Sequence, residues 1–230
     1  MPQSGRVPPP GEDTRINIVL IGPPGCGKGT QAARIAGRYE IPHISTGDIL
    51  RAAVQEGSPL GRAVEATLAA GGLVGDDLMT DLVCERLDRP DTRHGFILDG
   101  FPRTLAQAQA LDALPCGAAL IVLLFAVADS EILRRLGTRR VCGTCRLTQS
   151  VSGGVDAGPD SCPYCGGRLE RRKDDDPETV RRRLATYASF ATPLVAHYQK
   201  RAVLASINGL GALDEVTAAL CTHIESSRRP

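Results

Sequence analysis

Residues 22–30 read GPPGCGKGT, a composition typical of a loop that binds phosphate. The stretch fits the pattern G-x-x-x-x-G-K, in which glycines let successive backbone N–H groups curl around a phosphate group. Lys28 supplies a compact positive charge for the β- and γ-phosphates. A glycine-rich turn with an incidental lysine is the alternative interpretation. An apolar run precedes the stretch and a helical pattern follows it, so we favour nucleotide binding.

The residue after Lys28 departs from the usual form of this motif. Gly29 stands where Ser or Thr normally supplies a hydroxyl group to Mg²⁺, and Thr30 comes one position later. If Mg²⁺ is used, phosphate oxygens and water must therefore supply most of its ligands. Asp99 or Asp48 could orient those waters.

Four of the eight cysteines form two tight pairs with the spacing C-x₂-C-x₁₆-C-x₂-C. A single pair is compatible with a redox switch, half of a metal site or a nucleic-acid-binding ribbon. Two pairs at this spacing favour a tetrahedral site of four thiolates that binds Zn²⁺, although iron could occupy the same ligands. Four thiolates leave no open position for water, so the metal is expected to be structural. The predicted ligands are Cys142, Cys145, Cys162 and Cys165.

Composition argues against two other classes of protein. The net charge is +1, there is no Trp, and residues 146–165 contain one Arg, one Tyr and the acidic Asp156 and Asp160. A ribbon that binds nucleic acid would be basic and aromatic, so we expect no nucleic-acid partner; salt-dependent binding to DNA would revive that alternative. No apolar run approaches the ~20 residues of a membrane span, so no membrane association is expected.

Short apolar runs alternate with helical patterns along the chain. We predict five strands, within residues 15–25, 41–45, 95–100, 118–127 and 201–209, and helices that include residues 27–40, 104–114 and 176–200. This alternation predicts an α/β protein, a three-layer fold around a parallel five-stranded sheet.

Two segments interrupt the alternation. Residues 45–74 have helical patterns without a strand, and residues 138–175 hold the cysteine pairs and a Gly-rich loop. Both are predicted to be insertions into a core of residues 16–44, 75–137 and 176–230. Residues 1–15 are rich in Pro and Gly and contain no hydrophobic stretch, so we expect a disordered tail rather than a signal peptide. We therefore expect the protein to be cytoplasmic.

Three further motifs follow the phosphate loop at characteristic separations: HISTGDILR at 43–51, GFILDGFPRTLAQAQAL at 95–111 and RRKDDDPETVRRRL at 171–184. Together with the loop they closely resemble the adenylate kinase family over roughly residues 16–216. The resemblance implies a P-loop core, an AMP-binding insertion (45–74) and a mobile, bacterial-type zinc lid (138–175). It implies a monomer that transfers a phosphoryl group from ATP to AMP, giving two ADP without a covalent intermediate, with Mg²⁺ bound alongside ATP.

The resemblance also implies roles for individual residues. Several are arginines, whose planar guanidinium groups bond two phosphate oxygens at once. Expected catalytic residues are Lys28, Arg103, Arg139, Arg172 and Arg183. Expected ATP-binding residues are Gly25, Cys26, Gly27, Lys28, Gly29, Thr30, Arg135, Arg139, Thr148, Gln149 and Gly211. Expected AMP-binding residues are Thr46, Arg51, Gly72, Leu73, Val74, Gly100, Phe101, Pro102, Arg103, Gln107, Arg172 and Arg183. Asp174 and Asp175 are expected to pair with these arginines.

The chain departs from the family after the second cysteine, where Gln149 and Ser150 replace the usual Tyr-His pair. This change predicts weaker packing against the ATP base and a looser choice of phosphate donor. Gly75 replaces a proline that often follows the AMP-binding insertion, which favours a more flexible hinge. A UMP/CMP kinase is the alternative within the same class of enzyme. Those relatives typically have a short lid without zinc, so the long cysteine-containing lid favours AMP.

Overall fold

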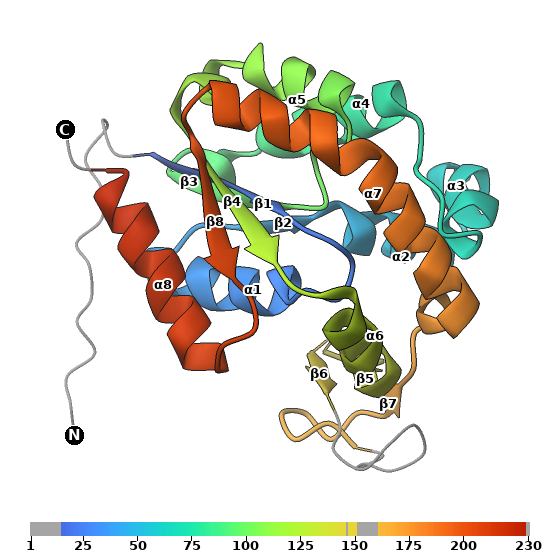
Figure 1. Cartoon of the computed structure of the whole chain (residues 1–230). Helices are drawn as coiled ribbons and strands as arrows, with labels where there is room; N and C mark the ends of the chain where they lie inside the picture. The colour runs from blue at the N-terminus through green and yellow to red at the C-terminus, as the bar shows by residue number, and fades with distance from the viewer. Residues whose placement is uncertain (1–14, 146, 151–160, 229–230) are drawn as a thin grey trace.

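A computed structural model describes residues 15–145, 147–150 and 161–228 of the 230-residue chain. The expected tail, apart from Arg15, lies outside the described residues, as does most of the Gly-rich loop with Asp156 and Asp160. The rest forms a parallel sheet between two layers of helices, with a smaller unit attached near one end (Figure 1).

The main sheet has five parallel strands in the order β2-β3-β1-β4-β8. The central strand β1 pairs with β3 along one edge and β4 along the other, so that Leu98 and Val122 flank its Val19. Its side chains are buried on both faces, because helices cover both faces of the sheet. The strands are β1 (Ile16–Ile21), β2 (His43–Ser45), β3 (Gly95–Asp99), β4 (Leu120–Ala126) and β8 (Leu204–Asn208). All five predicted strands and the parallel sheet are therefore confirmed.

Helices cover both faces of this sheet, as expected for a three-layer fold. On one face α1 (Lys28–Tyr39) and α8 (Leu213–Ser226) lie side by side and bury apolar side chains such as Ile35 and Leu220. On the other face lie α4 (Asp76–Leu87), α5 (Leu105–Asp112) and the C-terminal half of α7 (Pro177–Lys200). Short 3₁₀ turns complete the core at η1 (Pro90–Thr92), η2 (Pro115–Ala119) and η3 (Lys173–Asp175).

Residues 45–74 form two helices, α2 (Thr46–Gln55) and α3 (Pro59–Ala69), with no strand between them. Ser45 and Ser58 begin these helices, each accepting a hydrogen bond from a backbone N–H in the first turn. The two helices approach so closely at Gly61 that a Cβ atom there would lie 2.0 Å from the carbonyl oxygen of Ala53.

We expect Gly61→Ala to destabilise the protein by about 3 kcal/mol, because the new methyl group must force α3 away from the backbone of α2. Gly37→Ala is the matched control, since Gly37 lies within α1 and faces open space. Alanine there should instead stabilise the protein by about 0.5–1 kcal/mol. Urea unfolding of both variants measures the difference, and equal effects at the two positions would contradict the close packing of α2 and α3.

The cysteine pairs belong to a small antiparallel sheet that follows α6 (Asp129–Thr138). Its strands are β5 (Arg139–Cys142), β6 (Thr148–Ser150) and β7 (Leu169–Glu170), in the order β6-β5-β7. We call these strands and their described connections the cysteine unit. Its buried side chains are only Cys142, Cys162 and Leu169 among the described residues. So small an apolar cluster cannot stabilise a sheet by itself. The cysteine sulfurs are therefore candidates for a metal crosslink that stabilises the unit.

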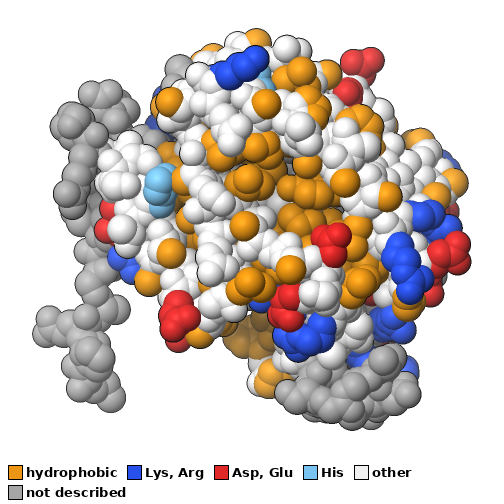
Figure 2. Space-filling view, viewed as in Figure 1, with side chains coloured by type: hydrophobic (Ala, Val, Ile, Leu, Met, Phe, Trp, Pro, Cys, Tyr) orange, Lys and Arg blue, Asp and Glu red, His pale blue; other side chains and the backbone are white. Residues whose placement is uncertain are grey.

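Helix α7 begins at Asp176, whose side chain accepts hydrogen bonds from the N–H groups of Glu178 and Thr179, with Pro177 in the first turn. Its N-terminal half rests on α6 through Val180, Ile132 and Leu136. Beside this contact, apolar side chains are visible in the middle of the face shown in Figure 2. A hollow of about 520 Å³ separates α7 from the end of β4 and is lined by Leu124, Val127, Leu184 and Tyr187 among others. The start of α7 is therefore held through α6 and also packs at Thr179 and Arg183 against Gly71, in the turn after α3.

No helix in the described part of the chain has both the length and the apolar character needed to cross a bilayer.

Candidate active site

The phosphate loop connects β1 to α1 at the carboxyl edge of the sheet. Gly25 and Gly27 have φ values of 82° and 105°, which L side chains rarely adopt. A Cβ atom on Gly25 would also lie 2.7 Å from Leu136 Cγ, so a side chain there would push the loop away from α6. The Nζ atom of Lys28 donates to the carbonyl oxygens of Gly22 and Pro23 at 2.6 and 2.9 Å. Its positive charge is thus held across the loop.

Cys26 and Thr30 of the predicted loop differ in their surroundings. The Cys26 side chain is buried in the core below the loop, with its Sγ 3.5 Å from Lys28 Nζ. Thr30 lies in the first turn of α1 and is exposed. The buried Cys26 side chain is closed off from solvent, whereas the backbone N–H groups, Lys28 and the exposed Thr30 are open to a phosphate.

Asp99 ends β3 beside the phosphate loop. Its carboxylate lies 3.5 Å from His43 Nε2, and a Cβ atom on Gly29 would approach it to 3.3 Å. Glycine after Lys28 therefore leaves room for this carboxylate next to the loop. Burial opposes ionisation of Asp99, but its contact with His43 and the charge of Lys28 keep its pKa below the usual value. An ionised carboxylate beside a phosphate loop fits the orientation of water around Mg²⁺.

Arg135 on α6 fastens the other side of the loop. Its guanidinium donates to the carbonyl oxygens of Cys26 at 3.2 Å and Gly209 at 2.8 Å, and to the Glu131 carboxylate at 2.7 Å. The helix that leads into the cysteine unit is thereby linked to the loop and to the turn after β8. Gly211 lies in that turn, just before α8.

Five predicted arginines come from separate elements. Arg51 is on α2, Arg103 follows β3, Arg139 begins β5, Arg172 precedes η3 and Arg183 is on α7. Three aspartates lie among four of these arginines, namely Arg51, Arg139, Arg172 and Arg183. Burial and the nearby positive charges of Arg183 and Arg51 lower the pKa of Arg103.

Asp48 and Asp174 link the arginines of different elements. Asp174 lies 3.1 Å from Arg183 and 4.0 Å from Arg51, whereas Asp48 lies 2.6 Å from Arg51 and 3.7 Å from Arg172. Burial, together with the like charges of Arg51 and Arg139, lowers the pKa of Arg172 to about 10. These guanidinium groups are therefore close enough together that the binding of a further anion, such as a phosphate, would be favourable.

Asp175 is the most buried member of this charged group, with 1% of its surface exposed. Both of its carboxylate oxygens accept from Arg139, with the Nε–Oδ2 distance at 2.7 Å. Arg183 lies 3.5 Å from the same carboxylate. The predicted pairing of Asp174 and Asp175 with arginines is thus confirmed, and the pair fixes the start of β5 against η3.

Six of the residues expected at the AMP site lie close to the end of β3. Thr46 Oγ1 lies 3.4 Å from the carbonyl oxygen of Asp99, and Arg103 Nε donates to Gly100 at 2.8 Å. Phe101 and Pro102 precede α5, in which Thr104 begins the helix and Gln107 lies in the first turn. These residues therefore share one region at the carboxyl edge of the sheet, the usual place for a ligand in such folds.

Sequence reasoning missed Asp76, the first residue of α4. Its carboxylate accepts from Thr104 Oγ1 at 3.0 Å and from Gln107 Nε2 at 2.8 Å. No spacing rule signals this contact, because 31 residues separate the partners. The remaining predicted residues lie at 72–74, after α3, and at Thr148 and Gln149 on β6, which pairs with β5. Across the β5–β6 pair, Gln149 lies opposite Arg140 and Thr148 lies opposite Val141.

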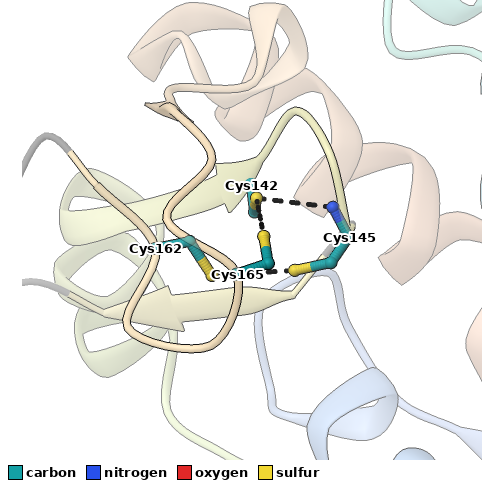
Figure 3. A group of neighbouring side chains, drawn as sticks. All are labelled: Cys142, Cys145, Cys162 and Cys165. Atoms are coloured by element: carbon teal, nitrogen blue, oxygen red, sulfur yellow. Dashed lines mark hydrogen bonds between the residues drawn. The ribbon is translucent and has the colours of Figure 1, made fainter.

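The four cysteines form one cluster, with their Sγ atoms all within 4.8 Å of one another. Figure 3 shows the side chains pointing toward a common centre. Bonds of about 2.3 Å to a tetrahedral zinc ion would place neighbouring sulfurs about 3.8 Å apart. The observed separations of 3.5 Å for Cys142–Cys165 and 3.6 Å for Cys145–Cys162 are close to that value. The donor set therefore fits a four-coordinate metal ion.

The same cluster would not hold four thiolates without a cation. Hydrogen bonds from the N–H groups of Cys145 and Thr144 lower the pKa of Cys142 to about 6. A backbone hydrogen bond at Leu147 favours the Cys145 thiolate, but burial and the three neighbouring sulfurs raise the pKa of Cys145 to about 12. Only a positive ion at the centre would favour the charged form of all four side chains.

Comparison with known proteins agrees with this geometry. The family model for adenylate kinase matches residues 20–203. An adenylate kinase of Moorella thermoacetica is 46% identical over 210 residues, which are 89% of this chain and 96% of the relative. An adenylate kinase of Acidothermus cellulolyticus is 45% identical over 206 residues, 88% of this chain and 95% of the relative. One from Thermodesulfovibrio yellowstonii is 41% identical over 213 residues, 91% of this chain and 99% of the relative.

The phosphate loop, the converging arginines, the four-cysteine cluster and this similarity over most of the chain lead to one conclusion: the chain belongs to the adenylate kinase family.

Proposed function

We propose that the protein transfers the γ-phosphoryl group of ATP to AMP, giving two ADP, by in-line displacement without a covalent intermediate. The observation that carries this proposal is the convergence of arginines from α2, β5, the η3 region and α7 around three aspartates. Arg103 connects this group to Asp99, which lies beside Lys28 of the phosphate loop. A transfer between two nucleotides gathers several negative charges, and its transition state spreads charge over the equatorial oxygens of the moving group. Fixed guanidinium groups are suited to that charge.

The two nucleotides have separate sites in this proposal. ATP binds with its phosphates against the loop N–H groups and Lys28, with Arg135 and Arg139 on the side of the cysteine unit. AMP binds near Thr46, Arg51, Arg103, Gln107 and the backbone at 72–74. Arg172 and Arg183 lie between these groups and contact the transferring phosphoryl group. Arg172 now pairs with Asp48, and Arg183 pairs with Asp174. A bound phosphate would compete with these carboxylates for the two guanidinium groups.

Two metal ions belong to the proposal. Asp99 would orient water toward Mg²⁺ bound with ATP, and the ion would supply positive charge to the β- and γ-phosphates. Zn²⁺ is held by Cys142, Cys145, Cys162 and Cys165 and is structural, because the four thiolates leave no position for a reacting water. Metal-binding thiolates are typical of proteins in reducing compartments, in agreement with a cytoplasmic location.

In this proposal the two insertions enclose the bound nucleotides. Residues 45–74 bind AMP, and residues 138–175 form a lid that closes over both nucleotides and excludes water, so that ATP is not simply hydrolysed. Residues 138–175 are joined to the core through the end of α6 and the start of α7, which pack on each other, and we propose that the lid moves about these two connections.

A coupled assay with ATP and a panel of AMP, UMP, CMP and GMP tests the proposed reaction. We expect AMP to have the highest kcat/KM by at least about a hundredfold. Faster transfer to UMP or CMP would show that the protein is another nucleoside monophosphate kinase. The same assay with GTP and CTP as donors tests the effect of Gln149 and Ser150: we expect measurable transfer from both, and a strong preference for ATP would contradict a looser donor site.

A further inference from the structure

The side-chain amide of Gln107 is buried and has a fixed orientation, with 2% of the residue exposed. Its Nε2 donates to Asp76 Oδ1 at 2.8 Å, whereas its Oε1 accepts from the backbone N–H of Arg103 at 2.7 Å. The carboxylate of Asp76 accepts and the backbone N–H of Arg103 donates, so each partner matches one end of the amide. If the amide rotated by 180°, its NH₂ group would face the N–H group of Arg103, and its carbonyl oxygen would face the carboxylate of Asp76. Both contacts would be repulsive.

Asp76 is itself held in place by its neighbours. Thr104 Oγ1 donates to its second carboxylate oxygen at 3.0 Å, and the same hydroxyl accepts from the N–H of Gln107 at 3.2 Å. Asp76 also occupies the first turn of α4, where the helix dipole favours a negative charge. The carboxylate, the hydroxyl and the amide thus form one connected network between the starts of α4 and α5.

This network leaves Gln107 with one N–H donor and one carbonyl lone pair for a ligand. Adenine has a donor at position 6 beside ring-nitrogen acceptors, so a glutamine amide can pair with it through both groups. A 6-oxopurine, such as hypoxanthine or guanine, has an acceptor at position 6 instead. An amide that was free to rotate could adapt to either base, whereas a fixed amide can match only one.

We propose that Asp76 is a positioning residue that fixes the Gln107 amide to accept adenine and to reject 6-oxopurines in the monophosphate acceptor. This inference rests on the proposed function, in which Gln107 contacts the base of AMP. Asp76 itself does not contact the substrate. Its effect is on the choice of acceptor base, while Lys28 and the arginines perform their roles without it.

The experiment compares kcat and KM for AMP and for IMP, the hypoxanthine nucleotide, in the wild type and in Asp76→Ala. We expect the substitution to raise KM for AMP about tenfold and to reduce the AMP/IMP ratio of kcat/KM by at least about tenfold, because a lost charged hydrogen bond frees the amide. The kcat at saturating AMP and the KM for ATP should change by less than about threefold. Asp77→Ala is the matched control, since Asp77 is the exposed neighbouring carboxylate in the same turn of α4.

Two further variants keep the test decisive. Asp76→Asn has a single amide oxygen in place of two carboxylate oxygens, so it should fold and still lower the AMP/IMP ratio by at least about threefold. Gln107→Ala should weaken discrimination as Asp76→Ala does, whereas Gln109→Ala, on the exposed side of α5, should leave it unchanged. In NMR spectra the side-chain N–H groups of Gln107 should exchange slowly with solvent in the wild type and rapidly in Asp76→Ala.

Failure of this inference can be told apart from failure of the proposed function. A wild-type protein that does not phosphorylate AMP would overturn both. A wild type that phosphorylates AMP but uses IMP equally well would overturn only the role of Asp76. So would an AMP preference that survives Asp76→Ala and Asp76→Asn, or an equal loss of preference in Asp77→Ala.

Discussion

Replacement of Lys28 by Met is expected to lower kcat about a thousandfold, a loss of about 4 kcal/mol of transition-state stabilisation. Met retains a long, unbranched side chain but removes the charge that Gly22 and Pro23 hold across the phosphate loop. Because negative charge on the transferring phosphates is stabilised by fixed groups rather than by water, solvent cannot replace the missing ammonium. Steady-state kinetics with ATP and AMP measures the effect.

Lys200→Met is the matched control for this experiment. Lys200 is an exposed residue in the last turn of α7, far along the helix from Arg183, so its replacement should change kcat by less than about twofold. Thermal unfolding should show that both variants are folded. If Lys28→Met retained more than a tenth of the wild-type kcat, the role of the lysine in phosphoryl transfer would have to be abandoned.

Loss of the metal is expected to unfold the cysteine unit while leaving the core folded. Purified protein should contain one equivalent of zinc, and Cys162→Ser should abolish its binding, because Cys162 is one of four converging ligands. The unit buries few apolar side chains of its own, so protection of its amides against hydrogen exchange should fall more than about a hundredfold. Amides of β1 and β3 should retain their protection.

Cys84→Ser is the control for the loss of a thiol, since Cys84 lies on α4 outside the cluster. It should retain the full metal content and normal exchange in β5 and β7. Metal analysis after gel filtration and exchange followed by mass spectrometry provide the measurements. Less than about half an equivalent of zinc in the wild type, or unchanged exchange and melting in Cys162→Ser, would rule out a structural metal site.

Local patterns in the sequence were enough to predict the main sheet. Each of its five strands is a short apolar run between turn-forming residues, and the helices at 104–114 and 176–200 begin with the capping residues Thr104 and Asp176. The strands of the cysteine unit were not predicted individually. They have four, three and two residues, too few for a periodic pattern.

The sequence by itself therefore determined the chemistry that is available: a phosphate loop, a set of arginines in recognisable motifs and four cysteines at metal-binding spacing. These features are local, because glycine conformations and short ligand spacings depend on adjacent residues. Tertiary structure alone decided which charges pair, such as Arg139 with Asp175, and that Asp76 fixes the amide of Gln107. Such pairs join residues 36 and 31 positions apart, and their meeting depends on how whole helices and strands pack rather than on either residue's neighbours.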